Sequence, residues 1–411
     1  MVGTYPYSLH VKDLDPDFMS NIESLVMASV RFLSVFGKST VGYYPQLASI
    51  SEASSPSTAN CISALYLFPN LFSREVLNNQ IEELFQMQFG VQTAPSVRYS
   101  WCTYERSSIW ATSKSLITIL DSNSLAINDL RVYRSISWLL DQHNQHKDGW
   151  GWGYSRGTPS RPYYTYFVLQ VLKRAILSSS QNKHLYLNGI TKGISYLRST
   201  RLCSGLWSNG SSVDPCPGNT LMAMAALLDI GKTLNRKEID DSSIENGRSF
   251  LIDSFLDPSG WENIYWTEPG LAFDIQFFPP GKIEYINLVL GKNSILIPVM
   301  LNWLINHWIP FPLKNTTRYL SGGWLWPSTE TNEPAPYTWT TALGLRSLSC
   351  VINGSDGHAA SIQFKTIDKM QFQLFLSLAN WKQLITNNTL LAVIAIVGVI
   401  LTALGIFVTI W

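Results

Sequence analysis

The sequence repeats a unit of roughly 45–55 residues, a length typical of helical-pair repeats, and this self-similarity restricts the fold more than any other feature. Each unit opens with a stretch of helical periodicity, passes through a loop rich in Gly, Pro and Trp, and closes with a second helical stretch. Helix pairs of this kind stack on their neighbours to bury a continuous core. The chain is therefore predicted to be all-α.

The loops and closing helices align across six units. Pro or Ser ahead of Thr supplies a helix start, where the hydroxyl caps free N–H groups. Gly beside Trp lets the chain turn while the indole fills the gap between neighbouring helix pairs, so Trp207 and Trp324 are predicted to be buried structural side chains. The closing helices are expected at residues 56–67, 108–120, 161–172, 216–228, 268–278 and 335–348.

Six helix pairs can close into a ring, with the second helices inside and the first helices as the outer wall. An open solenoid is the alternative, because paired helices also stack in that way. No unit has the polar character of a terminal cap, which favours the closed ring. The prediction is an (α/α)6 toroid over residues 20–355, preceded by an N-terminal segment of residues 1–19.

The C-terminus carries 22 residues without a charge, Leu390 to Trp411. About 20 apolar residues at a rise of 1.5 Å cross a hydrocarbon core of ~30 Å. We therefore predict a transmembrane helix at 389–411, after a linker and juxtamembrane helix at 356–388. The nearest cations, Lys365, Lys369 and Lys382, precede the span, and the positive-inside tendency places the N-terminal domain in the cytoplasm. The bilayer is thus an expected partner of a single-pass, tail-anchored protein.

Composition narrows the class of partner. The net charge is +1 and Lys and Arg form no dense cluster, so nucleic acid is not an expected partner. Fifteen Trp, 18 Tyr and 18 Phe suit either dense core packing or a cavity that holds an apolar ligand. The five cysteines are scattered; Cys203 and Cys216 are a candidate pair, but the odd number favours free thiols in a reducing cytoplasm.

Two segments carry a family resemblance: DGWGWGYSRGTPSRPYYTYFVLQVL (148–172) and GGWLWPSTETNEPAPYTWTTALGLRSL (322–348). Both resemble the Gly-Trp loop and Thr-led helix of the terpenoid cyclase and protein prenyltransferase superfamily, which includes the squalene–hopene cyclases. The likeness covers roughly residues 20–352. It implies an α/α-toroid whose apolar central cavity receives an isoprenoid or another hydrophobic ligand. These are packing motifs, and they do not fix the chemistry.

The motifs that carry the chemistry of this superfamily are incomplete here. Cyclases use an Asp-x-Asp-Asp acid, and the nearest acidic cluster, Asp13 to Asp17, lacks that pattern and reads as an exposed turn. Asp214 and Cys216 resemble two zinc ligands of the prenyltransferases, but Thr338 stands where the third ligand, a His, is expected. Catalytic zinc takes three protein ligands, so no metal and no cofactor is predicted.

A third acidic motif, Asp240 to Glu245, resembles a magnesium-binding motif of ionisation-type terpene synthases. It stands at the head of the fifth unit, where an Asp or Ser followed by Glu is an ordinary capping box. The helix-cap interpretation is preferred.

Asp274 is the candidate catalytic residue. It lies in the apolar stretch GLAFDIQFF, which we expect to be a closing helix that faces the cavity. Burial there would raise the pKa of the carboxyl into the range of a general acid. Phe273, Phe277 and Phe278 are the candidate ligand-binding residues, because aromatic faces stabilise cations. The alternative is a carboxylate that hydrogen-bonds a neighbouring unit.

Two functions remain in competition at this point. The first is a membrane-anchored toroid that binds an apolar, isoprenoid or lipid-like ligand, with catalysis left open. The second is a catalytically inactive toroid that serves as a membrane-attached interaction or effector module with a protein partner. The missing acid motif favours the second, and the dense aromatic side chains favour the first.

Overall fold

The computed structural model divides the chain into two compact units, residues 1–362 and 363–411. The predicted N-terminal segment (1–19), linker (356–388) and membrane span (389–411) lie outside the residues that the structure describes. All described residues belong to the first unit: 25–33, 54–68, 74–89, 100–103, 106–122, 124–178, 182–209, 213–268, 274–292, 294–310, 322–324 and 337–352.

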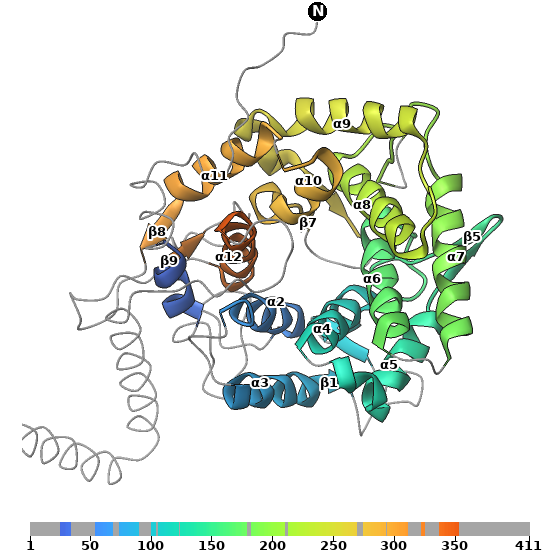
Figure 1. Cartoon of the computed structure of the whole chain (residues 1–411), viewed down its shortest axis with the longest axis horizontal. Helices are drawn as coiled ribbons and strands as arrows, with labels where there is room; N and C mark the ends of the chain where they lie inside the picture. Colours follow the sequence, from blue (N-terminus) through green and yellow to red (C-terminus); the bar gives the residue numbers. More distant parts are fainter. Residues whose placement is uncertain are drawn as a thin grey trace, which may run out of the picture. The chain divides into compact units, whose positions relative to one another are not determined.

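The even-numbered α-helices of the first unit form a closed inner ring (Figure 1). Each contacts the next in chain order, and the last, α12, packs against the first, α2. This contact between the ends of the series closes the ring and excludes the open solenoid for this unit. The inner helices are α2 (Ser55–Leu65), α4 (Ile109–Ser122), α6 (Pro162–Ser178), α8 (Pro217–Leu234), α10 (Ile283–Leu290) and α12 (Thr338–Ile352).

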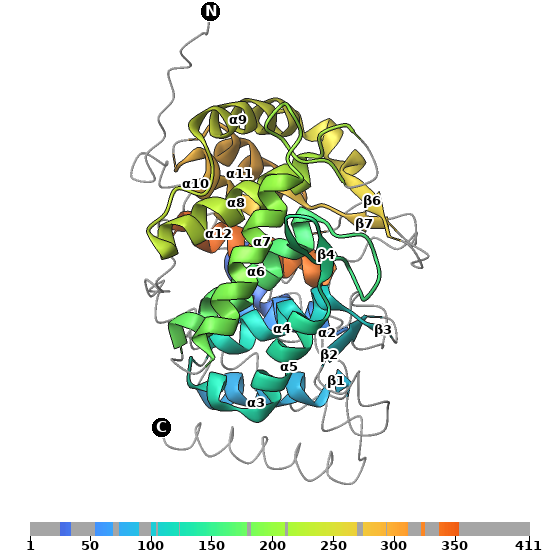
Figure 2. The same ribbon diagram turned by 90° about the vertical axis from the view of Figure 1, so that its right-hand side faces the viewer.

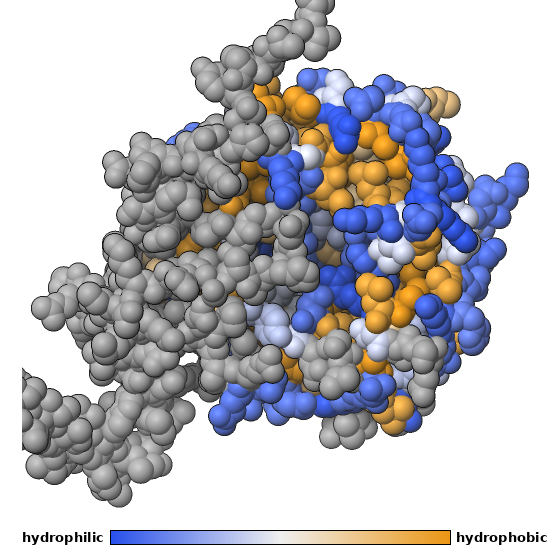
Figure 3. All heavy atoms as spheres, viewed as in Figure 1, coloured by the Kyte–Doolittle hydropathy of each residue, from blue (hydrophilic) through white to orange (hydrophobic). Residues whose placement is uncertain are grey.

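The odd-numbered helices lie outside this ring, and each contacts the inner helix that precedes it in the chain. Their sequences are amphipathic, as in α5, where Val132, Ile136 and Leu139 are buried at helical spacing. In the space-filling view, hydrophilic side chains follow the outer edge at α9, with hydrophobic side chains inward of it (Figure 3). The outer helices are α3 (Arg74–Gln86), α5 (Leu130–Asp141), α7 (Lys183–Ser199), α9 (Asp241–Phe255) and α11 (Leu296–Asn306), and residues 25–33 are also helical.

Short antiparallel strands precede several inner helices and gather at one end of the ring (Figure 2). Because the next α-helix after each hairpin is an inner helix, this end holds the N-termini of the inner helices. The strands are β1 (Gln88–Phe89), β2 (Ser100–Thr103), β3 (Arg106–Ser107), β4 (Asn144–His146), β5 (Gly149–Gly151), β6 (Tyr265–Thr267), β7 (Asp274–Gln276), β8 (Trp308–Pro310) and β9 (Gly322–Trp324). In the described part of the chain, 3-10 helices also form connections: η2 (Ser124–Asn128), η3 (Pro258–Asn263) and η4 (Pro279–Lys282).

A buried tryptophan in each described loop ties the outer helix to the inner helix that follows. Its indole N–H donates to a backbone carbonyl at the C-terminal end of the outer helix, as Trp207 Nε1 does to Leu197 O at 2.7 Å. Carbonyls in the last turn of a helix have no partner within the helix, so the indole supplies one. The other pairs are Trp101 with Leu84, Trp152 with Leu139, Trp261 with Phe255, and Trp324 with Leu304.

A threonine in the first turn or two of the inner helix completes the junction. The backbone N–H of Trp207 donates to Thr220 Oγ1 at 3.1 Å. The same bond joins Trp101 to Thr112, Trp152 to Thr165, and Trp324 to Thr341. Each of these threonines is the fourth residue of its helix, so it is a partner for the Trp backbone and not the helix cap that the sequence predicts.

The structure confirms the expected closing helices in five places and corrects one. The described residues of this stretch, Glu268 and 274–278, are not helical: they contain β7, which pairs with β6 in antiparallel register, with Thr267 opposite Asp274. The inner helix of this unit, α10, starts later, at Ile283, after Pro279 and Pro280. Two consecutive prolines cannot stand inside a helix, because they lack N–H groups and clash with the preceding turn. A search of the described residues for a helix long and apolar enough to cross a membrane found none.

Candidate functional site

A cavity of about 480 Å³ lies inside the ring. Every inner helix from α2 to α12 contributes to its lining, and no outer helix does. The lining residues come largely from the middle and the C-terminal halves of the inner helices, so the cavity lies toward the end of the ring opposite the hairpins. Such an interior space, walled by the closed ring of helices, is the candidate ligand site of this unit.

Aromatic and aliphatic side chains form part of the wall. Tyr166 and Phe167 of α6 are nearly fully buried, and Tyr166 meets Tyr285 of α10 edge to face with ring centroids 5.3 Å apart. Ile117 of α4 and Leu343 of α12 add aliphatic surface. These faces suit an apolar ligand, although the lining as a whole carries more charge than the family resemblance implies.

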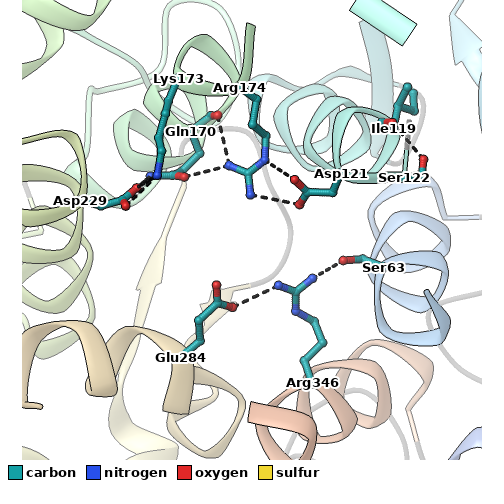
Figure 4. Close-up of polar contacts among 10 residues, drawn as sticks. All are labelled: Ser63, Ile119, Asp121, Ser122, Gln170, Lys173, Arg174, Asp229, Glu284 and Arg346. Carbon is teal, nitrogen blue, oxygen red and sulfur yellow. Dashed lines mark hydrogen bonds and ion pairs between the residues drawn. The ribbon is translucent and has the colours of Figure 1, made fainter. Parts of the chain in front are cut away.

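On the side of α6, ion pairs join the inner helices at the edge of the cavity, which we call the rim (Figure 4). Lys173 Nζ lies 2.7 Å from Asp229 Oδ1 of α8, and Gln170 donates to the same carboxylate. Arg174 Nε lies 2.6 Å from Asp121 Oδ1 of α4. These pairs join α6 to its two neighbours in the inner ring, α8 and α4. Cations in the last turns of α6 are also favourable because the C-terminus of a helix carries partial negative charge.

A second group secures the opposite side, where the ring closes. Arg346 of α12 donates to Glu284 Oε2 of α10 at 3.1 Å and also to Ser63 Oγ of α2. The guanidinium therefore bridges three helices at the seam between the last helix and the first. Arg174 and Arg346 face each other across the space between the two groups (Figure 4).

Two lysines near the cavity differ from those of the rim. Lys114 of α4 lines the cavity, with its ammonium nitrogen 4.2 Å from the centroid of the Phe167 ring. Lys282, before α10, is 2% exposed and lies over the rings of Tyr163, Phe277 and Tyr285. Burial lowers the pKa of Lys114 well below its usual value, and the charge of Lys282 lowers it further. Burial, with a smaller effect of Arg346, lowers the pKa of Lys282 to about 8.

The structure corrects two premises of the role predicted for Asp274. The residue lies in strand β7 and not on an inner helix, and its side chain is half-buried. Asp274 Oδ1 accepts a solvent-exposed hydrogen bond of 2.6 Å from Thr267 Oγ1, its partner across the hairpin. The catalytic role itself stays a prediction.

The predicted aromatic residues are partly in the core. Phe277 and Phe278 are each 1% exposed. Phe277 stacks on Phe255 at 6.0 Å, and Phe278 meets Trp303 edge to face at 5.7 Å. Neither belongs to the cavity lining. Phe273 lies outside the described residues.

The residues of the metal-like motifs stand at helix starts. Cys216 is the N-cap of α8, Thr338 is the first residue of α12, and Asp240 caps α9 by accepting from Ser243 N. Within the described part of the chain, no three His, Cys, Asp or Glu side chains lie together as a metal site would need. The cysteines described, Cys203 and Cys216 among them, are free thiols.

Sequence reasoning missed the buried carboxylate of Glu268, which lies at the hairpin end of the ring. Glu268 is 1% exposed and its Oε1 lies 2.6 Å from Arg161 Nε. Tyr164 donates to the same oxygen and in turn accepts from Trp266. Burial raises the pKa of Glu268, and the neighbouring guanidinium opposes that shift. The available signal was its position directly before Pro269 in the same stretch as Asp274, but sequence alone gave no reason to prefer Glu268.

Comparison with known proteins bears on the fold. No protein-family model matches the chain, and no curated protein matches it. Among solved structures, a variant of the type II terpene cyclase MstE from Scytonema, in complex with its product merosterolic acid A, is similar. It is 14% identical with a TM-score of 0.51, and the match covers 82% of this chain and 99% of that one. The GH76A alpha-1,6-mannanase from a Salegentibacter species is 13% identical with a TM-score of 0.53, over 82% and 99%.

At these identities the likeness concerns the fold alone. It supports the helical toroid, in agreement with the closed ring of contacts in the first unit. A terpene cyclase and a mannanase share this fold, so the fold by itself selects neither a ligand nor a reaction.

Proposed function

We propose that this chain is a membrane-anchored toroid of six helix-pair repeats that binds an isoprenoid or another apolar, lipid-like ligand in the cavity of its ring. The observation that carries the proposal is the cavity itself, whose wall includes Ile117, Tyr166, Phe167 and Leu343. The similar terpene cyclase is described with a terpenoid product bound, which makes an isoprenoid the first class of ligand to test. The uncharged stretch 390–411 supports attachment to a membrane.

The similarity to the mannanase suggests a sugar as the competing ligand. Glycoside hydrolysis generally requires two carboxylates that flank the bond, one as acid and one as base or nucleophile. The two carboxylates of the cavity lining, Asp229 and Glu284, are each held in an ion pair with a rim cation. That arrangement favours the apolar ligand.

The test is to purify the full chain from membranes and identify co-purified lipids by mass spectrometry after organic extraction. Ile117→Trp, which places a larger side chain in the cavity, should lose the ligand. Leu177→Trp is the matched control because Leu177 is 67% exposed at the end of α6. Equal recovery of lipid from both variants would place the ligand elsewhere. If neither the wild type nor added isoprenoids show binding, the membrane-attached interaction module becomes the better proposal.

Catalysis by Asp274 is tested by Asp274→Asn, which keeps the shape of the side chain and removes the acid. Because the side chain is half-buried at a hairpin, we expect the fold and ligand binding to be unchanged. Loss of a detected product with intact binding would support Asp274 as the acid. Unfolding of the variant, seen by circular dichroism, would instead make Asp274 a structural partner.

A further inference from the structure

The charges that line the cavity are unequal. Six cationic side chains line it, against the two carboxylates of Asp229 and Glu284. The cations are Lys114, Lys173, Arg174, Lys232, Lys292 and Arg346. A cavity with such an excess of one sign attracts the opposite sign, and the low dielectric of its walls strengthens the attraction.

Ion pairs and helix C-termini account for only some of these positive charges. Lys173, Arg174 and Arg346 each have a carboxylate partner within 3.1 Å. Lys173, Arg174 and Lys232 also stand in the last two turns of α6 and α8, where cations offset the partial negative charge of the helix C-terminus. These groups are accounted for by the fold alone.

Neither an ion pair nor a position near a helix C-terminus accounts for Lys114. It is the sixth residue of α4, more than two turns from the C-terminus of that helix. Among the described residues no carboxylate forms an ion pair with it, and its recorded contact is with the face of Phe167. Lys114 is half-buried, and the carboxylate that attracts it, that of Glu284, forms its ion pair with Arg346. A partly desolvated ammonium with no ion pair of its own is costly, so an anion that enters the cavity would offset this cost.

Lys282 places a second positive charge beside the cavity, although Lys282 itself is not part of the cavity lining. Lys282 is 2% exposed, its ammonium lies 5.5–5.8 Å from three aromatic ring centroids, and it likewise forms no ion pair within the described chain. Its neighbours Gly281, Glu284 and Tyr285 line the cavity. The like charge of Lys282 contributes to the lowered pKa of Lys114. An anion in the cavity would offset this repulsion.

We propose that the cavity is an anion site, and that its ligand presents a carboxylate or phosphate head group to Lys114 while its apolar part lies against the aromatic wall. The hydroxyls of Tyr166 and Tyr285, which also line the cavity, are further donors from α6 and α10. The proposal rests on the proposed function for the apolar part of the ligand. The anion site itself stands on the unpaired lysines and is testable without it.

Four probes separate the two parts of the proposal: tetradecyl phosphate, myristate, tetradecanol and inorganic phosphate. Binding of each to the purified full chain is measured by isothermal titration calorimetry at pH 7. We expect the two anionic amphiphiles to bind at least tenfold more tightly than the alcohol of the same chain length. The ratio between phosphate and carboxylate then identifies the preferred head group.

The variants are Lys114→Met and Lys282→Met, with Lys192→Met on the exposed face of α7 as the matched control. Lys114→Met should reduce the preference for anionic amphiphiles to less than threefold, Lys282→Met should reduce it in part, and Lys192→Met should leave it unchanged. We expect the fold to be unchanged, because Lys114 and Lys282 form no ion pair within the described chain, and circular dichroism with Lys114→Gln as a second variant checks this.

The outcomes are distinguishable. Equal affinity for alcohol and anions, or an undiminished preference in Lys114→Met, overturns the anion site while leaving apolar binding intact. Affinity for inorganic phosphate that depends on Lys114, without any gain from the alkyl chain, supports the anion site and contradicts the proposed apolar ligand. Failure of all four probes to bind overturns both.

Discussion

Trp207 and Trp324 show how much one residue contributes to each junction. Both are fully buried, and each indole N–H satisfies a carbonyl at the end of an outer helix. The backbone N–H of each tryptophan donates to a threonine hydroxyl of the following inner helix. One residue therefore fixes an outer helix, a loop and an inner helix relative to each other. The sequence-based expectation that these tryptophans are structural is confirmed.

Replacement of either tryptophan should be strongly destabilising. We expect Trp207→Ala and Trp324→Ala each to lower the free energy of unfolding by ~3–5 kcal/mol, because both the buried volume and a carbonyl partner are lost. Trp207→Phe keeps most of the volume and should cost less. Urea unfolding measures all three variants, and a loss under ~1 kcal/mol for both alanine variants would contradict a structural role.

Lys282 gives a prediction with a definite sign in pH. Its pKa is about 8 in the folded protein, below the ordinary value of 10.5. Between these values the unfolded state binds more protons, so this group makes the protein more stable as pH rises from 8 toward 10.5. Wild type should therefore gain about 2 kcal/mol relative to Lys282→Met between pH 7 and pH 9.5.

The measurement is urea unfolding of wild type and Lys282→Met at both pH values, without added ligand. Lys192→Met controls for the loss of one positive charge from the whole chain. A difference between wild type and Lys282→Met that does not change with pH would contradict the lowered pKa.

At the scale of elements, close packing against a neighbouring side chain can outweigh the helix propensity of a residue. Gly344 stands inside α12, where alanine would normally be preferred by about 1 kcal/mol. A Cβ at this position would lie 2.7 Å from the ring of Trp324. Gly151 and Gly323, each beside a loop tryptophan, are likewise closely approached by Ser160 and Thr341. All three glycines serve close packing, whereas for Gly151 and Gly323 the sequence had suggested turn formation.

Gly344→Ala should therefore destabilise the protein in spite of its higher helix propensity. We expect a loss of about 1–3 kcal/mol, because Trp324 is buried and hydrogen-bonded and has little room to move. Gly260→Ala is the control, since no atom lies within 4 Å of a Cβ built there, and it should change stability by less than about 0.5 kcal/mol. Thermal unfolding of both variants checks the difference, and equal stability would mean that Trp324 can shift.

At the scale of the whole molecule, the ring closes through contacts between segments almost 300 residues apart. Arg346 of α12 donates to Ser63 of α2, and Cys61 Sγ lies 3.8 Å from Thr338 O. The first unit, residues 1–362, thus has its own closed core, and residues 363–411 form a separate compact unit. The predicted membrane span belongs to the second.

Deletion of residues 390–411 should release the ring domain from membranes in folded form, because the inner and outer helices bury one another within the first unit. Fractionation of cells that express the full and truncated chains measures the release, with circular dichroism as the test of folding. Retention of the truncated chain in the membrane fraction, or its export from the cytoplasm, would contradict the predicted tail anchor and its orientation.

The sequence by itself determined the helical class, the positions of most closing helices and the structural use of tryptophan. These follow from local rules: helical periodicity, Pro and Thr at helix starts, and aromatic side chains at repeated offsets. These rules did not predict the stretch 268–278 correctly, because a short apolar run fits a strand as well as a helix. The pairing of β7 with β6 decides in favour of the strand.

Only the tertiary structure decided which charged groups are buried and what faces the cavity. Asp274 and Glu268 lie six residues apart in the same loop region, yet Glu268 is buried against Arg161 and Asp274 bonds across an exposed hairpin. Lys114 and Lys282 come from distant units and act on one space because the ring brings α4 and α10 to the same cavity. The burial of a charged group and its interaction with other charges depend on neighbours that are remote in the chain. Local sequence patterns do not identify these neighbours.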